Sequence, residues 1–213
     1  MDLKVYPSQS PVAAVVLAHG AGAGASSAFM VRTAVGLAER GTSTATFDFP
    51  YISAGRKVPD RADVLERSWR EAIELAREIF SGLPLFIGGK SMGSRIASHV
   101  AAQGCNGLRG VILLGYPLHP PGRPDQRRDA HLPAIHEPML FVQGTRDAFG
   151  RAEEIHALLP SLQRAAIHEV EGGDHSFKVS GRGAPGPEAV LGRVLDAVAD
   201  WVRSHLAAHG GPS

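Results

Sequence analysis

Six short strand-like segments alternate with longer segments of helical spacing along this chain. The strand-like segments cover residues 12–18, 42–47, 85–89, 111–114, 139–142 and 165–170. Several of them, such as 12–18 and 111–114, are continuously apolar, which is typical of strands buried on both faces of a parallel sheet. Strands that alternate with helices predict an α/β fold: a doubly wound, mostly parallel sheet of about six or seven strands with helices on both faces.

Segments with apolar residues at every third or fourth position predict the helices between these strands. They lie between Ser27 and Gly41, between Asp60 and Phe80, at 94–103, at about 151–159 and at 188–206. Ser26 or Ser27 is expected to cap the first helix and Asp60 the second, because short oxygen-bearing side chains satisfy the free N–H groups at helix starts.

Residues 118–137 follow neither period and are crowded with Pro, Arg, Asp and His. We expect them to form a long excursion over the strand ends. The chain contains no large inserted cap domain, so residues 1–213 are predicted to be a single domain with 207–213 as a flexible tail.

Composition narrows the class of partner. The 22 basic and 21 acidic residues give a formal charge of +1, so no bulk field attracts the chain to nucleic acid or to an anionic membrane. The apolar residues 12–18 could be read as the core of a secretory signal, but residues 1–11 carry a single lysine. The only cysteine, Cys105, lacks base or metal-ligand spacing, which indicates a structural thiol in a reducing, cytoplasmic compartment.

The segment that follows the third predicted strand carries the first candidate for chemistry. It reads Gly89-Lys90-Ser91-Met92-Gly93 and lies between a strand and a helix. This G-x-S-x-G pattern in this context is typical of a nucleophile elbow, where glycines let strand and helix approach closely and the serine hydroxyl leaves the sheet. Gly-Lys-Ser also ends a phosphate-binding loop, but Pro84 occupies the position of that motif's leading glycine.

Two further polar residues follow later strands, in the order Ser91, Asp147, His175. A serine nucleophile needs a base to take its proton and a carboxylate to orient that base. The carboxyl ends of parallel strands share one edge of the sheet, so we expect these three side chains to meet there as nucleophile, acid and base. Asp174 competes with Asp147 for the acid role, but a neighbour of His175 in sequence is better suited to shaping the turn.

The glycine-rich loop after the first predicted strand is expected to complete the site. Its backbone N–H at Ala21 or Gly22, together with that of Met92, could hold a developing oxyanion. His19 is expected to support this loop and is also a candidate substrate-binding residue.

The same loop has a second interpretation. Residues 20–25 fit G-x-G-x-x-A, and Asp48 follows at the end of the next strand, as in dinucleotide-binding proteins. That interpretation leaves the order Ser91, Asp147, His175 unexplained, and the helix after the glycines begins late for a pyrophosphate.

Other polar residues near the strand ends are candidate substrate-binding residues. They are Asp48, Lys90, Tyr116 and His119. Lys90 could hold the elbow through an ion pair, with Asp48 as partner, or attract an anionic group.

The excursion carries further charged residues. Arg123, Arg127, Arg128 and His131 could form a rim that reads carboxylates or phosphates, or could simply be solvated. Because His119, His131 and His136 lack metal-ligand spacing, we expect no metal and no cofactor.

Several motifs together resemble one known family. They are Leu-Ala-His-Gly-Ala-Gly-Ala, Phe-Asp-Phe-Pro-Tyr, Gly-Gly-Lys-Ser-Met-Gly-Ser-Arg, Tyr-Pro-Leu-His-Pro-Pro-Gly, Gln-Gly-Thr-Arg-Asp and Gly-Gly-Asp-His-Ser-Phe. They resemble the small α/β-hydrolase branch related to dienelactone hydrolases, which includes a subunit of the NSL histone-acetyltransferase complex. The resemblance implies the α/β-hydrolase fold and the roles of Ser91, Asp147 and His175. Dienelactone hydrolases proper use cysteine at the position of Ser91, so their lactone substrate is not implied.

The leading hypothesis is a cytoplasmic serine hydrolase that cleaves small carboxylic esters or thioesters through an acyl-enzyme. Without a cap domain, its pocket should be shallow and suited to small acyl groups. A hydrolase-fold interaction module without efficient catalysis is the main alternative. The sequence does not indicate an oligomeric state.

Overall fold

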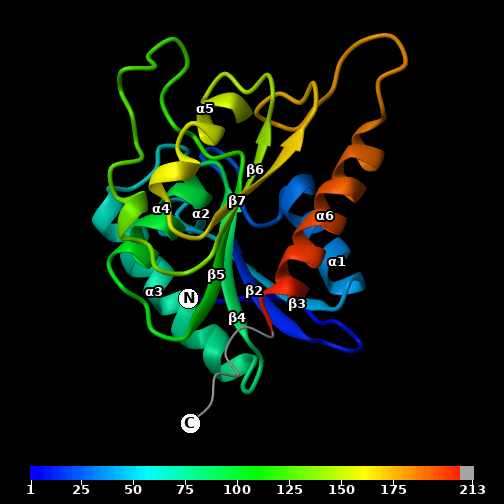
Figure 1. Cartoon of the computed structure of the whole chain (residues 1–213). Coiled ribbons are helices and arrows are strands. Elements are labelled where there is room, and N and C mark those ends of the chain that lie inside the picture. Colours follow the sequence, from blue (N-terminus) through cyan, green and yellow to red (C-terminus); the bar gives the residue numbers. More distant parts are fainter. Residues whose placement is uncertain (207–213) are drawn as a thin grey trace.

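The computed structural model describes residues 1–206, which form a seven-stranded sheet with helices on both faces (Figure 1). The strand order is β1-β3-β2-β4-β5-β6-β7, and every pairing is parallel except the antiparallel pairing of β1 with β3. The strands are β1 (Lys4–Tyr6), β2 (Ala13–Ala18), β3 (Thr42–Phe47), β4 (Leu85–Lys90), β5 (Leu108–Leu114), β6 (Met139–Gly144) and β7 (Ala165–Val170). The predicted doubly wound sheet is confirmed, whereas the predicted tail at 207–213 lies outside the described residues.

The helices divide between the two faces of the sheet (Figure 1). One face is covered by α1 (Ala28–Glu39) and α6 (Pro187–Ser204), and the other by α2 (Pro50–Ser53), α3 (Ala62–Ile79) and α4 (Met92–Ala102). The short α5 (Ala152–His156) packs against β6 and β7. The described residues also contain two 3₁₀ turns, η1 (Leu132–Ala134) and η2 (Leu159–Ser161).

Each central strand contributes to two hydrophobic cores because successive side chains point to opposite faces. In β2, Val15 and Leu17 pack with α1 and α6, whereas Val16 packs with α3 and α4. On the latter face the fully buried Trp69 meets Phe47 edge to face, with ring centroids 5.0 Å apart. Burial of each such side chain stabilises the fold by roughly 1.5–3 kcal/mol, so the sheet is a rigid platform for the loops at its carboxyl edge.

One strand and one α-helix were absent from the sequence prediction. β1 has three residues, lies at the sheet edge and is largely exposed, so its sequence carries no hydrophobic pattern. α2 is a single turn that starts at Pro50. The predicted N-cap at Asp60 is wrong, because Arg61 occupies the N-cap position of α3. Asp60 instead pairs with Arg56 at 2.7 Å. Ser27 does occupy the cap position of α1, but its side chain makes no cap hydrogen bond.

Candidate active site

Ser91 lies on a sharp corner between β4 and α4, with φ 52° and ψ −114°. A non-glycine residue in this region costs on the order of 1–3 kcal/mol and persists only where its surroundings enforce it. The flanking glycines are part of that enforcement. A Cβ at Gly89 would lie 2.3 Å from the carbonyl oxygen of Ala18, and one at Gly93 would lie 2.2 Å from the same oxygen. The elbow therefore needs glycine at both positions.

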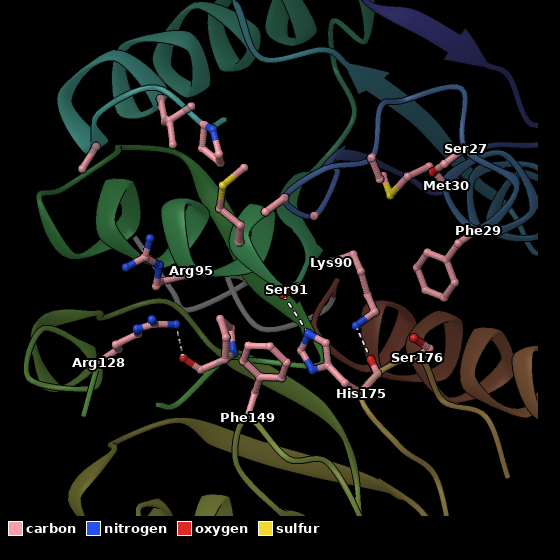
Figure 2. A pocket seen from close by; sticks show the side chains of 18 of the residues that line it. Ser27, Phe29, Met30, Lys90, Ser91, Arg95, Arg128, Phe149, His175 and Ser176 are labelled. Atoms are coloured by element: carbon pink, nitrogen blue, oxygen red, sulfur yellow. Dashed lines mark hydrogen bonds between the residues drawn. The ribbon is translucent and has the colours of Figure 1, made fainter. Parts of the chain in front are cut away.

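The side chains of Ser91, His175 and Asp147 form a continuous chain of hydrogen bonds (Figure 2). The Nδ1 of His175 is 2.8 Å from Oδ2 of Asp147, and its Nε2 is 2.8 Å from Oγ of Ser91. Because a carboxylate can only accept, Nδ1 carries the hydrogen and Nε2 is free to accept the hydroxyl proton. The Asp147 side chain is fully buried, while that of His175 is 22% exposed.

Gln143, in β6, is a residue that the sequence interpretation missed. Its side-chain Nε2 donates to Oδ2 of Asp147 at 3.0 Å and to the carbonyl oxygen of Gly150 at 2.6 Å, while its Oε1 accepts from the N–H of Tyr116 at 2.8 Å. The other carboxylate oxygen of Asp147 accepts from the N–H of Phe149 at 2.8 Å. The sequence signal that could have identified it is a single amide side chain in an otherwise apolar strand. An amide that is buried there needs hydrogen-bond partners nearby.

The loop that carries His175 is held on several sides. The Phe149 ring lies against the imidazole, with centroids 4.2 Å apart. Oδ1 of Asp174 accepts from the N–H groups of Ser176 and Lys178 at 2.8 and 2.9 Å, so Asp174 shapes the turn as the sequence indicated. These contacts leave the imidazole little rotational freedom.

Lys90 supports the same loop from the opposite side. Its Nζ donates to the carbonyl oxygen of His175 and lies 5.1 Å from the centre of the Phe177 ring. Burial lowers the pKa of Lys90 to about 8, against the opposing pull of the Asp147 and Asp174 carboxylates. The predicted partner Asp48 is wrong, because the ammonium group is engaged by this carbonyl.

His19 and Asp48, two of the candidate substrate-binding residues, are not among the residues that line the cavity beside Ser91. The fully buried His19 donates through Nδ1 to the carbonyl oxygen of Gly20 at 2.8 Å and accepts at Nε2 from the N–H of Phe49. Burial lowers its pKa, in keeping with a neutral ring. Asp48 accepts from the N–H of Ala25 at 2.7 Å. Both residues therefore shape the glycine-rich loop.

The dinucleotide interpretation would place Asp48 against a ribose. In the structure, Oδ1 of Asp48 instead accepts a hydrogen bond from the glycine-rich loop, through the N–H of Ala25.

Tyr116 and His119, the other two candidates of this kind apart from Lys90, likewise do not line that cavity. The buried Tyr116 hydroxyl donates to the carbonyl oxygen of Arg128 at 2.6 Å. Nε2 of His119 lies 3.0 Å from Oε2 of Glu154. Both residues tie the excursion to the body of the protein.

The four charged residues of the excursion separate in the structure. Arg127 pairs with Asp129 at 2.6 Å, and His131 bonds to Ser98 at 2.8 Å. Arg123 is exposed, and only Arg128 reaches the cavity wall. The predicted rim therefore does not form as a group.

Two of the predicted oxyanion donors lie in the cavity wall. Met92 and Ala21 line it, whereas Gly22 is exposed and does not. Within residues 1–206, neither the N–H of Met92 nor that of Ala21 donates to a backbone carbonyl. Both N–H groups are therefore free to bind an oxygen atom.

Ser91 and His175 open onto a cavity of about 550 Å³ (Figure 2). Its apolar wall includes Phe29, Met30 and Leu65, and this volume lies within the range of small-molecule sites. The excursion contributes Arg128 to its wall, and α3 contributes Ala62 and Leu65.

Residues 1–206 hold no group of three or more His, Cys, Asp or Glu side chains placed to bind a metal ion. Over the same residues, every helix is too short or too polar to cross a membrane.

Fold and site together define an α/β protein of the hydrolase class. A family model described as alpha/beta hydrolase domain matches residues 11–203, and the chain therefore belongs to this family.

Solved structures show the same fold. The chain superimposes on an alpha-beta serine hydrolase homologue from Coxiella burnetii with a TM-score of 0.74 and 16% identity, covering 94% of this chain and 90% of that one. Est1E from Butyrivibrio proteoclasticus with bound ferulic acid gives a TM-score of 0.77 and 14% identity, covering 97% of this chain and 95% of that one. A thermostable carboxyl esterase from Bacillus coagulans in complex with glycerol gives a TM-score of 0.76 and 14% identity, covering 96% of this chain and 94% of that one. The expected α/β-hydrolase fold is confirmed.

Proposed function

We propose that this protein is a serine hydrolase that cleaves carboxylic esters or thioesters of small molecules through an acyl-enzyme. The observation that carries the proposal is the hydrogen-bonded series of Ser91, His175 and Asp147 at the mouth of a cavity. Ser91 is the nucleophile, His175 the general base and Asp147 the residue that orients the imidazole.

The chemistry proceeds in two halves. Oγ of Ser91 attacks the substrate carbonyl carbon while Nε2 of His175 takes the hydroxyl proton, which forms a tetrahedral intermediate. The intermediate collapses to the acyl-enzyme, and the imidazolium returns the proton to the departing alcohol or thiol. Nε2 then takes a proton from water, whose oxygen attacks the acyl carbonyl carbon. The second tetrahedral intermediate collapses as the imidazolium returns the proton to Oγ of Ser91, and the carboxylic acid is released.

Charge on the tetrahedral oxygen needs donors that are already in place. The N–H groups of Met92 and Ala21 are the proposed oxyanion hole, since both line the cavity and are unpaired within residues 1–206. Removing one such donor in other enzymes costs about 10²–10³ in kcat. Asp147, fully buried beside Nδ1, stabilises the imidazolium that forms in the same step.

Two observations support this proposal over an interaction module that lacks efficient catalysis. The hydroxyl of Ser91 opens onto a cavity large enough for a substrate, and two structurally similar proteins are described as a serine hydrolase homologue and a carboxyl esterase. A dienelactone-hydrolase-like relationship, a single domain over 1–213 and a cytoplasmic location belong to the same proposal.

The test is the hydrolysis of 4-nitrophenyl acetate by wild type, Ser91→Ala and Ser27→Ala. Ser27 lines the same cavity but makes no cap hydrogen bond, so it controls for the loss of a cavity hydroxyl. We expect turnover by wild type and Ser27→Ala and a loss of at least about 10³-fold in Ser91→Ala. Equal turnover by wild type and Ser91→Ala would contradict the proposal.

A further inference from the structure

Two arginines of the cavity wall, Arg95 in α4 and Arg128 in the excursion, have no acidic partner among residues 1–206. Seven of the eighteen arginines form an ion pair, among them Arg32 with Glu188, Arg40 with Asp196 and Arg127 with Asp129. Most of the remaining arginines are exposed to solvent, whereas the guanidinium groups of Arg95 and Arg128 belong to half-buried residues of the cavity wall.

Arg95 is partly buried, and its Nε atom is buried without a hydrogen-bond partner. Burial and the neighbouring positive charge of Arg128 both lower the pKa of Arg95. A buried donor without an acceptor is costly, and two like charges side by side add to the cost. An anion placed between the two side chains would offset both costs.

The position of Arg128 is fixed by its backbone. Its N–H donates to the carbonyl oxygen of Leu118 at 2.9 Å, and its own carbonyl accepts from the hydroxyl of Tyr116 at 2.6 Å. Its side chain makes only a long hydrogen bond of 3.5 Å, to the carbonyl oxygen of Pro117. The backbone is thus anchored while the guanidinium keeps most of its donors for a ligand.

The charges around the cavity favour an anion. Its wall contains the cationic Lys90, Arg95 and Arg128 and one acidic side chain, Asp60. Asp60 is paired with Arg56 at 2.7 Å through its Oδ1 atom. Figure 2 shows Arg95 and Arg128 next to each other on one side of Ser91 and Phe29 on the opposite side.

We infer that Arg95 and Arg128 form an anion-binding subsite beside Ser91, and that the substrate is an ester or thioester bearing a carboxylate or phosphate away from its reacting carbonyl. The inference rests on the proposed function for its substrate class. The planar guanidinium forks suit these anions because each can donate two parallel N–H bonds to neighbouring oxygens. The anionic end would fix the substrate, with its carbonyl held toward Ser91.

Two matched pairs of esters test this inference without assuming which end carries the anion. In the first pair, 4-nitrophenyl hydrogen adipate and 4-nitrophenyl hexanoate have acyl chains of equal length, and only the former ends in a carboxylate. In the second, 4-acetoxybenzoate and phenyl acetate differ by a carboxylate on the leaving group. Wild type should show the higher kcat/KM for the anionic member of at least one pair.

Arg95→Gln and Arg128→Gln should each lower kcat/KM for that anionic ester by about 10- to 100-fold, the value of a hydrogen bond to a charged group. Hydrolysis of the neutral ester should change by less than about threefold. Arg123→Gln, which removes an exposed charge from the same excursion, is the matched control and should leave both rates unchanged. Equal losses on both members of each pair, or no anionic preference in either, would overturn the inference while leaving the hydrolase intact.

A binding experiment separates this inference from the proposed catalysis. Thermal melting of Ser91→Ala is measured with adipate and, in a parallel arm, with inorganic phosphate. A rise in Tm with either anion that is lost in Ser91→Ala/Arg128→Gln supports the subsite even if no ester is turned over, and the arm that responds identifies carboxylate or phosphate. The absence of a rise with both anions would overturn it.

Discussion

At the elbow, the atoms nearest to Gly89 and Gly93 are backbone atoms, so a side chain at either position would not fit without moving the backbone. At Gly93 a Cβ would meet the carbonyl oxygens of Ala18 and His19 at 2.2 and 2.7 Å. Neither oxygen can move without displacing the end of β2 and the loop that follows it. The strained serine and its tight glycines therefore belong to one rigid unit.

We predict that Gly93→Ala lowers the free energy of unfolding by about 3 kcal/mol or more, because backbone must shift to relieve the overlap. Gly192→Ala is the matched control, since Gly192 lies within α6 and its Cβ would meet no atom within 4 Å. It should stabilise the protein by about 0.5–1 kcal/mol. Urea unfolding of both variants measures the difference, and equal effects would contradict this account of the elbow.

Asp147 and Asp174 are both near His175 but differ in role. The former contacts Nδ1 at 2.8 Å, whereas the latter accepts backbone N–H groups of its own turn. We predict that Asp147→Asn lowers kcat for ester hydrolysis by about 10³–10⁴-fold, because an amide favours the wrong imidazole tautomer. Asp174→Asn should lower kcat by less than about tenfold. Steady-state kinetics on both variants would contradict the assignment if the order were reversed.

At the scale of elements, one histidine of the excursion contributes a polar contact with α4. Nε2 of His131 is 2.8 Å from Oγ of Ser98, and its ring lies against that of His99, with centroids 4.3 Å apart. Burial lowers the pKa of His131 to about 4, assisted by the charges of His99 and Arg95 and opposed by Asp129 and Glu66. The neutral ring is therefore part of this contact.

This histidine makes the protein sensitive to acid. Because its folded pKa lies below the unfolded value near 6.5, its contribution to stability is present above pH 6.5 and is lost as the pH falls toward 4. We predict that His131→Gln loses less stability than wild type between pH 6.5 and pH 4.5, by on the order of 2 kcal/mol. Parallel pH titrations of the free energy of unfolding measure this, and superimposable curves would contradict it.

Helices and strands whose apolar residues recur at a regular spacing were predictable from the sequence, and elements without such a spacing were not. The apolar runs of β2 and β5 and the buried stripe of α3 follow from spacing alone. β1 could not be found because an exposed edge strand of three residues buries no face. The start of α3 was misplaced because Asp60 is an excellent cap in isolation, but an ion pair with Arg56 takes its carboxylate.

Within the site, the positions that the sheet topology determines were predictable, whereas the orientations of individual side chains were not. The strand ends predicted that Ser91, Asp147 and His175 would meet, because topology alone brings them to one edge. The orientation of a side chain is not contained in its position along a strand. Tyr116 and His119 follow β5 as predicted, yet both turn into the protein, while Gln143 within β6 reaches Asp147.

At the scale of the whole molecule, the parallel sheet brings distant sequence positions to one site. β4, β6 and β7 each end at the same edge, where the loops that follow them place Ser91, Asp147 and His175 beside a single cavity (Figures 1 and 2). The excursion adds Arg128 to one wall, and the loop after β2 adds Ala21. In the proposed enzyme, chemistry and substrate recognition are thus divided between different loops of one frame.

The most direct test of the central claim is covalent labelling with a fluorophosphonate, followed by intact-mass and peptide analysis. The account predicts that folded wild type gains one adduct located at Ser91, and that Ser91→Ala gains none. His175→Ala should label far more slowly, because the base that activates the hydroxyl is gone. A folded wild-type protein that stays unlabelled, or that carries the adduct on another residue, would contradict the account.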